Sequence, residues 1–303
     1  MPDLADAAKR LLLGRPVRSE NLGHTLLPKR IALPIFASDA LSSVAYAPDE
    51  VLLTLAVAGV GATVISPWVG LAVIVVMATV IASYRQNVHA YPSGGGDYEV
   101  ATVNLGPKAG VTVASALLVD YVLTVAVSVS SGTQYAAAAV PALRGHETIF
   151  AVVLVVLLTL ANLRGVRESG TAFAVPVYLY MVAVGSTAIF GFVQYLTGNL
   201  QPAESSHLTI VPQQGFDQGL VGAAGAFLVL RAFASGSAAL TGVEAISNGV
   251  PAFRKPKSKN AATTLLLLGT LSVFLIMSIL TLARLTGVHY VERPHEQLLS
   301  DGV

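Results

Sequence analysis

The residues from Phe36 to Tyr46 read FASDALSSVAY and place a carboxylate inside a long apolar run. Four oxygen-bearing side chains in this stretch recur at spacings of i, i+3, i+4 and i+7: Asp39, Ser42, Ser43 and Tyr46. On a helix, residues at these spacings share one face. A second oxygen-rich face follows later in the chain, made by Asp120, Thr124, Ser128 and Ser131, with Tyr121 beside the acid. Because hard cations prefer oxygen ligands, two such faces predict a cation site. Serine and threonine could instead bond back to helix carbonyls or join helices.

A third acid, Glu244, lies in FASGSAALTGVEAISNG, a stretch interrupted by glycines and hydroxyls. Residues 38–44 and 237–243 share the pattern S-x-A-L-[ST]-x-V. This correspondence favours a five-plus-five inverted repeat, in which the first and sixth helices are discontinuous and form a midplane site. The expected first break, SDALSSVAY, contains no glycine, which favours side-chain oxygens around a cation over backbone amides around a carboxylate.

The composition indicates an all-α protein that crosses a membrane several times. Hydrophobic residues make up 54% of the 303 residues and charged residues only 12%, with a mean hydropathy of +0.68. An ordinary soluble domain carries about 25% charged residues. Cysteine is absent and the six histidines are scattered, which excludes disulfides and a His/Cys metal site.

About 20 apolar residues cross a bilayer as a helix, and this rule predicts seven spans. They lie near 31–61, 67–91, 109–143, 149–163, 173–196, 220–248 and 261–285. Lys and Arg gather in the N-terminal arm and in the loops on the same side, which predicts a cytoplasmic N-terminus. The expected organisation is a cytoplasmic arm (1–30), a first five-helix repeat (31–198), an extracytoplasmic loop (199–219), and two helices of an incomplete second repeat with a short tail (220–303).

Four stretches of the chain closely resemble the KimA-like potassium importers, a branch of the amino acid–polyamine–organocation (APC) superfamily. They read FASDALSSVAYAPDEVLL, YRQNVHAYPSGGGDYEVATVNLG, LLVDYVLTVAVSVSSG and LTGVEAISNGVPAFRKPKSKNA, and the match runs in order from about Arg30 to Leu285. The first and third stretches are the more specific. The resemblance implies a LeuT-type fold and proton-coupled potassium uptake at the bacterial inner membrane, with an ion site between the first, third and sixth helices.

The resemblance also assigns roles to particular residues. The potassium ligands it implies are Asp39, Tyr46, Asp120, Tyr121, Thr124, Ser128 and Thr241. Glu244 would couple transport to protons, since a buried carboxylate can exchange a proton. No cofactor is implied beyond the transported potassium ion and proton, and no nucleic acid partner. The expected environment is the lipid bilayer. The resemblance also implies that full-length members of the family form homodimers and bind c-di-AMP through a C-terminal domain. These 303 residues lack that domain, so a truncated product is expected.

Three other interpretations remain. An amino acid/proton symporter uses the same fold, although the two extra acids and the fifth span, which has no lysine, weigh against it. An intramembrane aspartyl protease is disfavoured, because GGGD lies in a polar loop and PAL at the outer end of a span. A fragment without transport activity of its own is the third. No enzyme motif is found elsewhere, so a non-enzyme is predicted.

Overall fold

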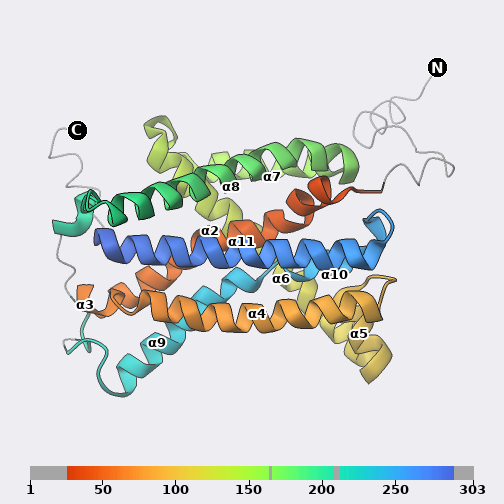
Figure 1. Ribbon diagram of the computed structural model, residues 1–303, viewed down its shortest axis with the longest axis horizontal. Coiled ribbons are helices and arrows are strands. Elements are labelled where there is room, and N and C mark those ends of the chain that lie inside the picture. The colour runs from red at the N-terminus through yellow and green to blue at the C-terminus, as the bar shows by residue number, and fades with distance from the viewer. Residues whose placement is uncertain (1–25, 164–165, 208–211, 217, 290–303) are drawn as a thin grey trace. The chain divides into compact units, whose positions relative to one another are not determined.

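The computed structural model describes residues 26–163, 166–207, 212–216 and 218–289, without the side chains of 166–173. These residues are almost entirely helical (Figure 1). The α-helices are α2 (Lys29–Ala56), α3 (Val60–Thr63), α4 (Ser66–Ala90), α5 (Gly96–Leu105), α6 (Pro107–Ala139), α7 (Glu147–Leu163), α8 (Val166–Leu196), α9 (Gly222–Gly236), α10 (Glu244–Asn248) and α11 (Lys257–Thr286). Most of the predicted N-terminal arm and the C-terminal tail from residue 290 lie outside the described residues.

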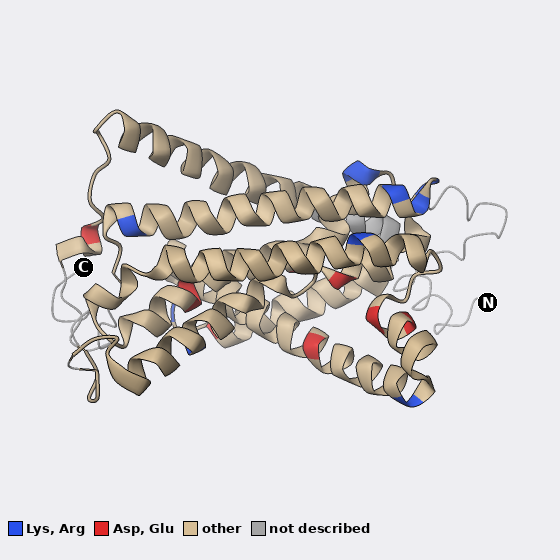
Figure 2. Ribbon diagram, turned by 60° about the horizontal axis from the view of Figure 1, so that its bottom comes forward, with Lys and Arg blue, Asp and Glu red and all other residues tan. Residues whose placement is uncertain are grey.

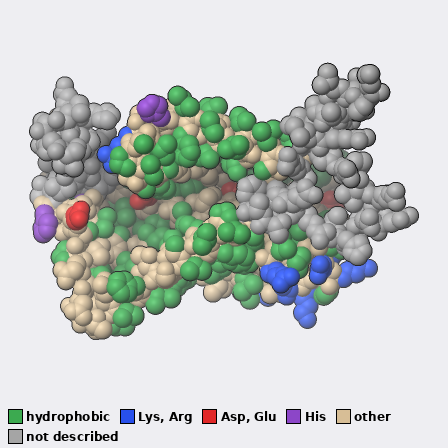
Figure 3. Space-filling view, turned by 90° about the horizontal axis from the view of Figure 1, so that it is seen from above, with side chains coloured by type: hydrophobic (Ala, Val, Ile, Leu, Met, Phe, Trp, Pro, Cys, Tyr) green, Lys and Arg blue, Asp and Glu red, His purple; other side chains and the backbone are tan. Residues whose placement is uncertain are grey.

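Six segments of the described chain are long and apolar enough to cross a membrane. They are Lys29–Ala56, Val60–Ala90, Pro107–Ala139, Ala174–Leu196, Gly222–Asn248 and Lys257–Thr286. The fourth predicted span, near residues 149–163, corresponds to α7, an apolar helix of 17 residues that is shorter than the rest. Large apolar side chains lie exposed on these helices, including Leu118 and Leu196, and hydrophobic atoms cover much of the face seen in Figure 3. Exposed apolar side chains of this kind are expected where helices face lipid.

The segment between α4 and α6 is more ordered than the sequence predicted. GGGD, residues 94–97, is predicted to lie in a polar loop, whereas the structure has a left-handed glycine turn at Gly94–Gly96 that leads directly into α5. Gly106 ends α5 with a φ of 93°, and Pro107 then begins α6. Glycine after one helix and proline at the first turn of the next are the favoured residues for such a corner.

Two predicted helix breaks have different outcomes. The first span, α2, runs as one uninterrupted α-helix through the SDALSSVAY stretch, so the break predicted there is not seen. In the sixth predicted span, near residues 220–248, α9 ends at Gly236, a 3₁₀ helix follows over Ser237–Leu240 (η4), and α10 begins at Glu244. Gly242 lies between η4 and α10 with a left-handed φ of 86°.

The chain forms two compact units, and several helices continue from one unit into the other. Of the described residues, the first unit contains 26–43, Ala78–Val182 and Leu240–Leu271. The second contains Val44–Met77, Ala183–Ala239 and 272–289. In the first unit, α6 packs against α5 and α7. In the second, small residues allow close helix packing: the side chains of Val51 and Val73 press on Gly236.

Candidate cation site

A cavity of about 920 Å³ lies in the first unit among α2, α6, α7 and α8. Four of the predicted ligands line it: Asp39, Tyr121, Thr124 and Ser128. Part of each oxygen-rich face predicted from helical spacing, Asp39 and Ser42 on α2 and Thr124 and Ser128 on α6, therefore lines a common space. Apolar side chains such as Phe36, Val125 and Leu158 complete the wall. An apolar wall with a few convergent polar groups is the usual form of a small-ligand site.

Hydroxyl groups join α2 to α6 inside this cavity. Ser42 Oγ lies 2.7 Å from the backbone carbonyl of Asp39 and donates its hydrogen there. It also lies 3.1 Å from Ser128 Oγ. Because a serine hydroxyl carries one hydrogen, Ser128 must be the donor in this second bond. The two serines thus set the spacing of the helices beside the Asp39 carboxylate.

The left-handed turn at Gly242, between η4 and α10, lies against α2. A Cβ atom at Gly242 would lie 2.6 Å from the backbone nitrogen of Ala40 and 2.9 Å from Cβ of Asp39. Glycine has no Cβ and accepts a positive φ at little cost, so it alone permits this approach. The close packing places Thr241 and Glu244, which flank the turn, near the Asp39 end of the cavity.

We expect Gly242→Ala to destabilise the protein by about 1–3 kcal/mol, because it adds both a steric clash and an unfavourable φ. The measurement is the melting temperature of the purified protein in detergent. Gly145→Ala is the matched control: Gly145 also has a positive φ, of 80°, but its added Cβ would meet open space. Equal melting temperatures for the two variants would contradict the close approach of the turn to α2.

Three acids lie close to one another at this site. The carboxylate charges of Asp39 and Asp120 interact, and Glu244 interacts with both. Glu244 is only 7% exposed, and its Oε1 atom is buried without a hydrogen-bond partner among the described residues. Basic positions are few along the helices and lie mainly near helix ends (Figure 2). Buried acids without a basic partner need a compensating cation or proton.

Not every predicted ligand lines the cavity. Asp120 and Thr241 are half-buried residues beside it, and neither belongs to its wall. Tyr46 is buried, with 7% exposed, but it belongs to the second unit, so its predicted role as a ligand stays a prediction. Ser131, on the predicted face of α6, does not line the cavity either.

The cavity also contains polar residues that the sequence interpretation missed. Thr159 and Asn162 reach it from α7, and Ser38 from α2. Thr159 and Asn162 are spaced i, i+3 in an otherwise apolar helix, which is the same signal that identified the faces of α2 and α6. Thr159 Oγ1 donates its hydrogen to the carbonyl of Val155, which leaves the two lone pairs of the hydroxyl oxygen as possible acceptors or ligands.

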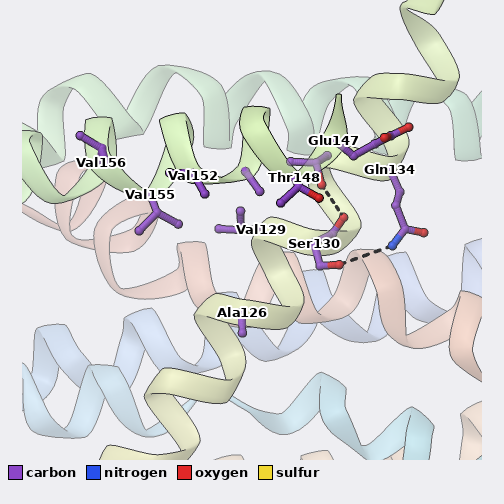
Figure 4. A pocket seen from close by; sticks show the side chains of 11 residues that line it. Ala126, Val129, Ser130, Gln134, Glu147, Thr148, Val152, Val155 and Val156 are labelled. Atoms are coloured by element: carbon purple, nitrogen blue, oxygen red, sulfur yellow. Dashed lines mark hydrogen bonds between the residues drawn. The ribbon is translucent and has the colours of Figure 1, made fainter. Parts of the chain in front are cut away.

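A second cavity, of about 440 Å³, lies between α6 and α7 in the first unit (Figure 4). Its polar end is formed by Ser130, Gln134, Glu147 and Thr148, and its other end by valines. Gln134 Nε2 lies 3.4 Å from Ser130 Oγ, and Glu147 accepts a hydrogen bond of 2.9 Å from the Gly145 nitrogen. None of the predicted ligands lines this cavity, so the polar side chains of α6 are divided between two separate spaces.

Comparison with known proteins identifies the class of this molecule. Residues 33–289 match the family described as amino acid permease. The chain belongs to this family. It is also 42% identical over 293 residues to the potassium transporter KimA of Bacillus subtilis (strain 168), an alignment that covers 96% of this chain and 46% of that protein. The chain therefore spans about half the length of this curated relative, and the family is one of transporters and not of enzymes.

Proposed function

We propose that this chain holds the potassium site of a secondary active transporter that couples potassium uptake to protons. The observation that carries the proposal is the cavity in which Asp39 and the oxygens of Tyr121, Thr124 and Ser128 face one another beside two further acids. Oxygen ligands can replace the hydration shell of a potassium ion in such a space. The 42% identity to a potassium transporter supports the choice of ion.

Asp120, Thr241 and Tyr46 complete the proposed ligand set. Asp120 supplies a second negative charge next to the Asp39 carboxylate. Thr241 sits on the irregular backbone between η4 and α10, where interrupted helices of transporters present carbonyl oxygens to cations. Tyr46 lies two helical turns beyond Asp39 on α2. Glu244, buried and lacking a partner for Oε1, is the proposed proton carrier.

The family description, amino acid permease, names a different kind of substrate. An amino acid carries a carboxylate, which basic side chains bind most strongly, whereas the charged side chain that lines this cavity is the acid Asp39, with hydroxyls and the amide of Asn162 around it. Within the described residues, no Lys or Arg side chain lines it. The charge of the site therefore favours a bare monovalent cation. The proposed setting is the bacterial inner membrane, with the N-terminus cytoplasmic and two copies associating.

The test is equilibrium binding of rubidium-86 to the purified chain in detergent, with unlabelled potassium, sodium and a mixture of amino acids as competitors. We expect saturable rubidium binding that potassium displaces and amino acids leave unchanged. Displacement by an amino acid, or rubidium binding that never saturates, would contradict the potassium site. The alternative substrate class is then examined directly with radiolabelled amino acids.

A further inference from the structure

Asn248, the last residue of α10, contacts one of the proposed ligands. Its Nδ2 atom donates a hydrogen bond of 2.9 Å to the hydroxyl oxygen of Tyr121 on α6. Tyr121 lines the cation cavity, but Asn248 does not. The hydrogen bond to the Tyr121 hydroxyl therefore connects Asn248 to the wall of the cavity.

The glycine turn before α5 fits closely around Asn248. A Cβ atom at Gly96 would collide with Asn248 Oδ1, and one at Gly94 would lie 2.9 Å from the Asn248 backbone oxygen. Both glycines have a positive φ, which favours glycine. Next to them, Tyr84 donates a hydrogen bond of 2.7 Å to Asp97 Oδ2 and so ties the start of α5 to α4. The oxygen of the Asn248 amide therefore packs against Gly96, and its nitrogen donates a hydrogen bond to Tyr121.

The hydrogen bond from Asn248 determines which direction of the Tyr121 hydroxyl oxygen stays available to a ligand. A phenolic hydroxyl has two lone pairs and one hydrogen, and the Asn248 amide occupies one lone pair. The second lone pair and the hydrogen then have fixed directions. Hydrogen bonds to a group that ligates a metal ion hold that group in the orientation in which it binds the ion.

We infer that Asn248 is a positioning residue for cation binding: its amide, packed against the Gly94–Gly96 turn, orients the Tyr121 hydroxyl toward the cavity. The inference rests on the proposed potassium site and deepens it. It assigns a role to the glycine turn, which the sequence motifs contain but the proposed ligand set does not use.

The first experiment compares Asn248→Ala with Asn104→Ala in rubidium-86 binding to the purified chain. Asn104 Nδ2 donates a bond of 2.8 Å to the Tyr91 hydroxyl, so this control removes the same kind of pair away from the cavity. Asn248→Ala should raise the half-saturating rubidium concentration about fivefold, the effect of losing one hydrogen bond between neutral groups, without changing the number of sites. Asn104→Ala should leave both quantities unchanged.

A double variant separates positioning from general structure. If Asn248 acts through Tyr121, then Asn248→Ala adds nothing to Tyr121→Phe, whereas independent effects would multiply. Asn248→Leu, which keeps the approximate size of the side chain but loses the amide donor without adding a charge, gives the same readout if Asn248→Ala fails to fold. Multiplicative effects in the double variant would overturn the inference.

The glycine turn provides a second, independent route to the same result. Gly96→Ala should displace the Asn248 amide and weaken rubidium binding. Gly106→Ala is the control and should leave rubidium binding unchanged. Gly106 also has a positive φ, of 93°, but a Cβ there would meet open space. Binding by the unaltered chain that is insensitive to Asn248→Ala and Gly96→Ala would overturn the positioning role alone. An unaltered chain that binds no rubidium would overturn the potassium site and, with it, this inference.

Discussion

Asp39→Asn should weaken rubidium binding about tenfold to a hundredfold, the range expected when an interaction with a full charge worth about 1.5–3 kcal/mol is lost. The substitution keeps the size of the side chain and removes its charge. Asp39 is the acid that lines the cavity, and no basic side chain of the described chain forms an ion pair with it. A cation in the cavity would therefore be its principal electrostatic partner. The measurement is the half-saturating rubidium concentration of the purified variant.

Glu50→Gln is the matched control for this variant. Glu50 is an exposed carboxylate on the same helix, α2, and it does not line the cavity. Its neutralisation should leave rubidium binding within about twofold of the unaltered chain, since an exposed charge contributes little. Equal losses in Asp39→Asn and Glu50→Gln would show that the general charge of the protein attracts the ion, which would contradict a specific role for Asp39.

Glu244→Gln should abolish the stimulation of rubidium uptake by an inward proton gradient while rubidium binding persists. Glutamine keeps the shape of Glu244 but cannot exchange a proton. Glu244 is proposed as the proton carrier because its Oε1 atom is buried without a partner among the described residues. The measurement is uptake with and without the gradient, at a saturating rubidium concentration.

The control for Glu244 is Glu147→Gln. Glu147 is an acid at the start of α7, and its side chain lines the second cavity. Glutamine at this position can still accept the hydrogen bond from the Gly145 nitrogen. This variant should keep its gradient stimulation. A Glu244→Gln protein that still responds to the gradient would exclude Glu244 as the proton carrier. A variant that no longer binds rubidium would instead place Glu244 among the ligands.

The sequence predicted the site best where a helical period alone decides the outcome. Of the residues grouped by spacing, Asp39 and Ser42 on α2 and Thr124 and Ser128 on α6 line one cavity. Ser43, Tyr46, Asp120 and Ser131 belong to the same predicted faces and do not line it. A regular helix places such residues on one face whatever the rest of the fold does. The division of the chain into apolar spans was predictable for the same reason, because it depends on length and hydropathy.

Features that depend on packing were not predictable. The contact of Asn248 with Tyr121 joins residues 127 positions apart, and no local pattern marks it. The residues of the glycine turn and α5 were predicted as a loop, because a run of glycines favours turns. The conformation that the turn adopts depends on its packing against α10, which no local sequence pattern indicates. The expected break in α2 was inferred from its similarity to residues 237–243, yet α2 lacks the left-handed glycine that interrupts the later segment at Gly242.

The most direct test of the potassium site is rubidium-86 uptake by bacteria that lack their own potassium importers. The cells express this chain alone or, in parallel, the Bacillus subtilis potassium transporter with this chain in place of its matching segment. With protein shown to reach the membrane, we predict uptake that an inward proton gradient accelerates and that Asp39→Asn abolishes. Uptake of amino acids in place of rubidium, or rubidium uptake indifferent to Asp39→Asn, would contradict a potassium site in this cavity.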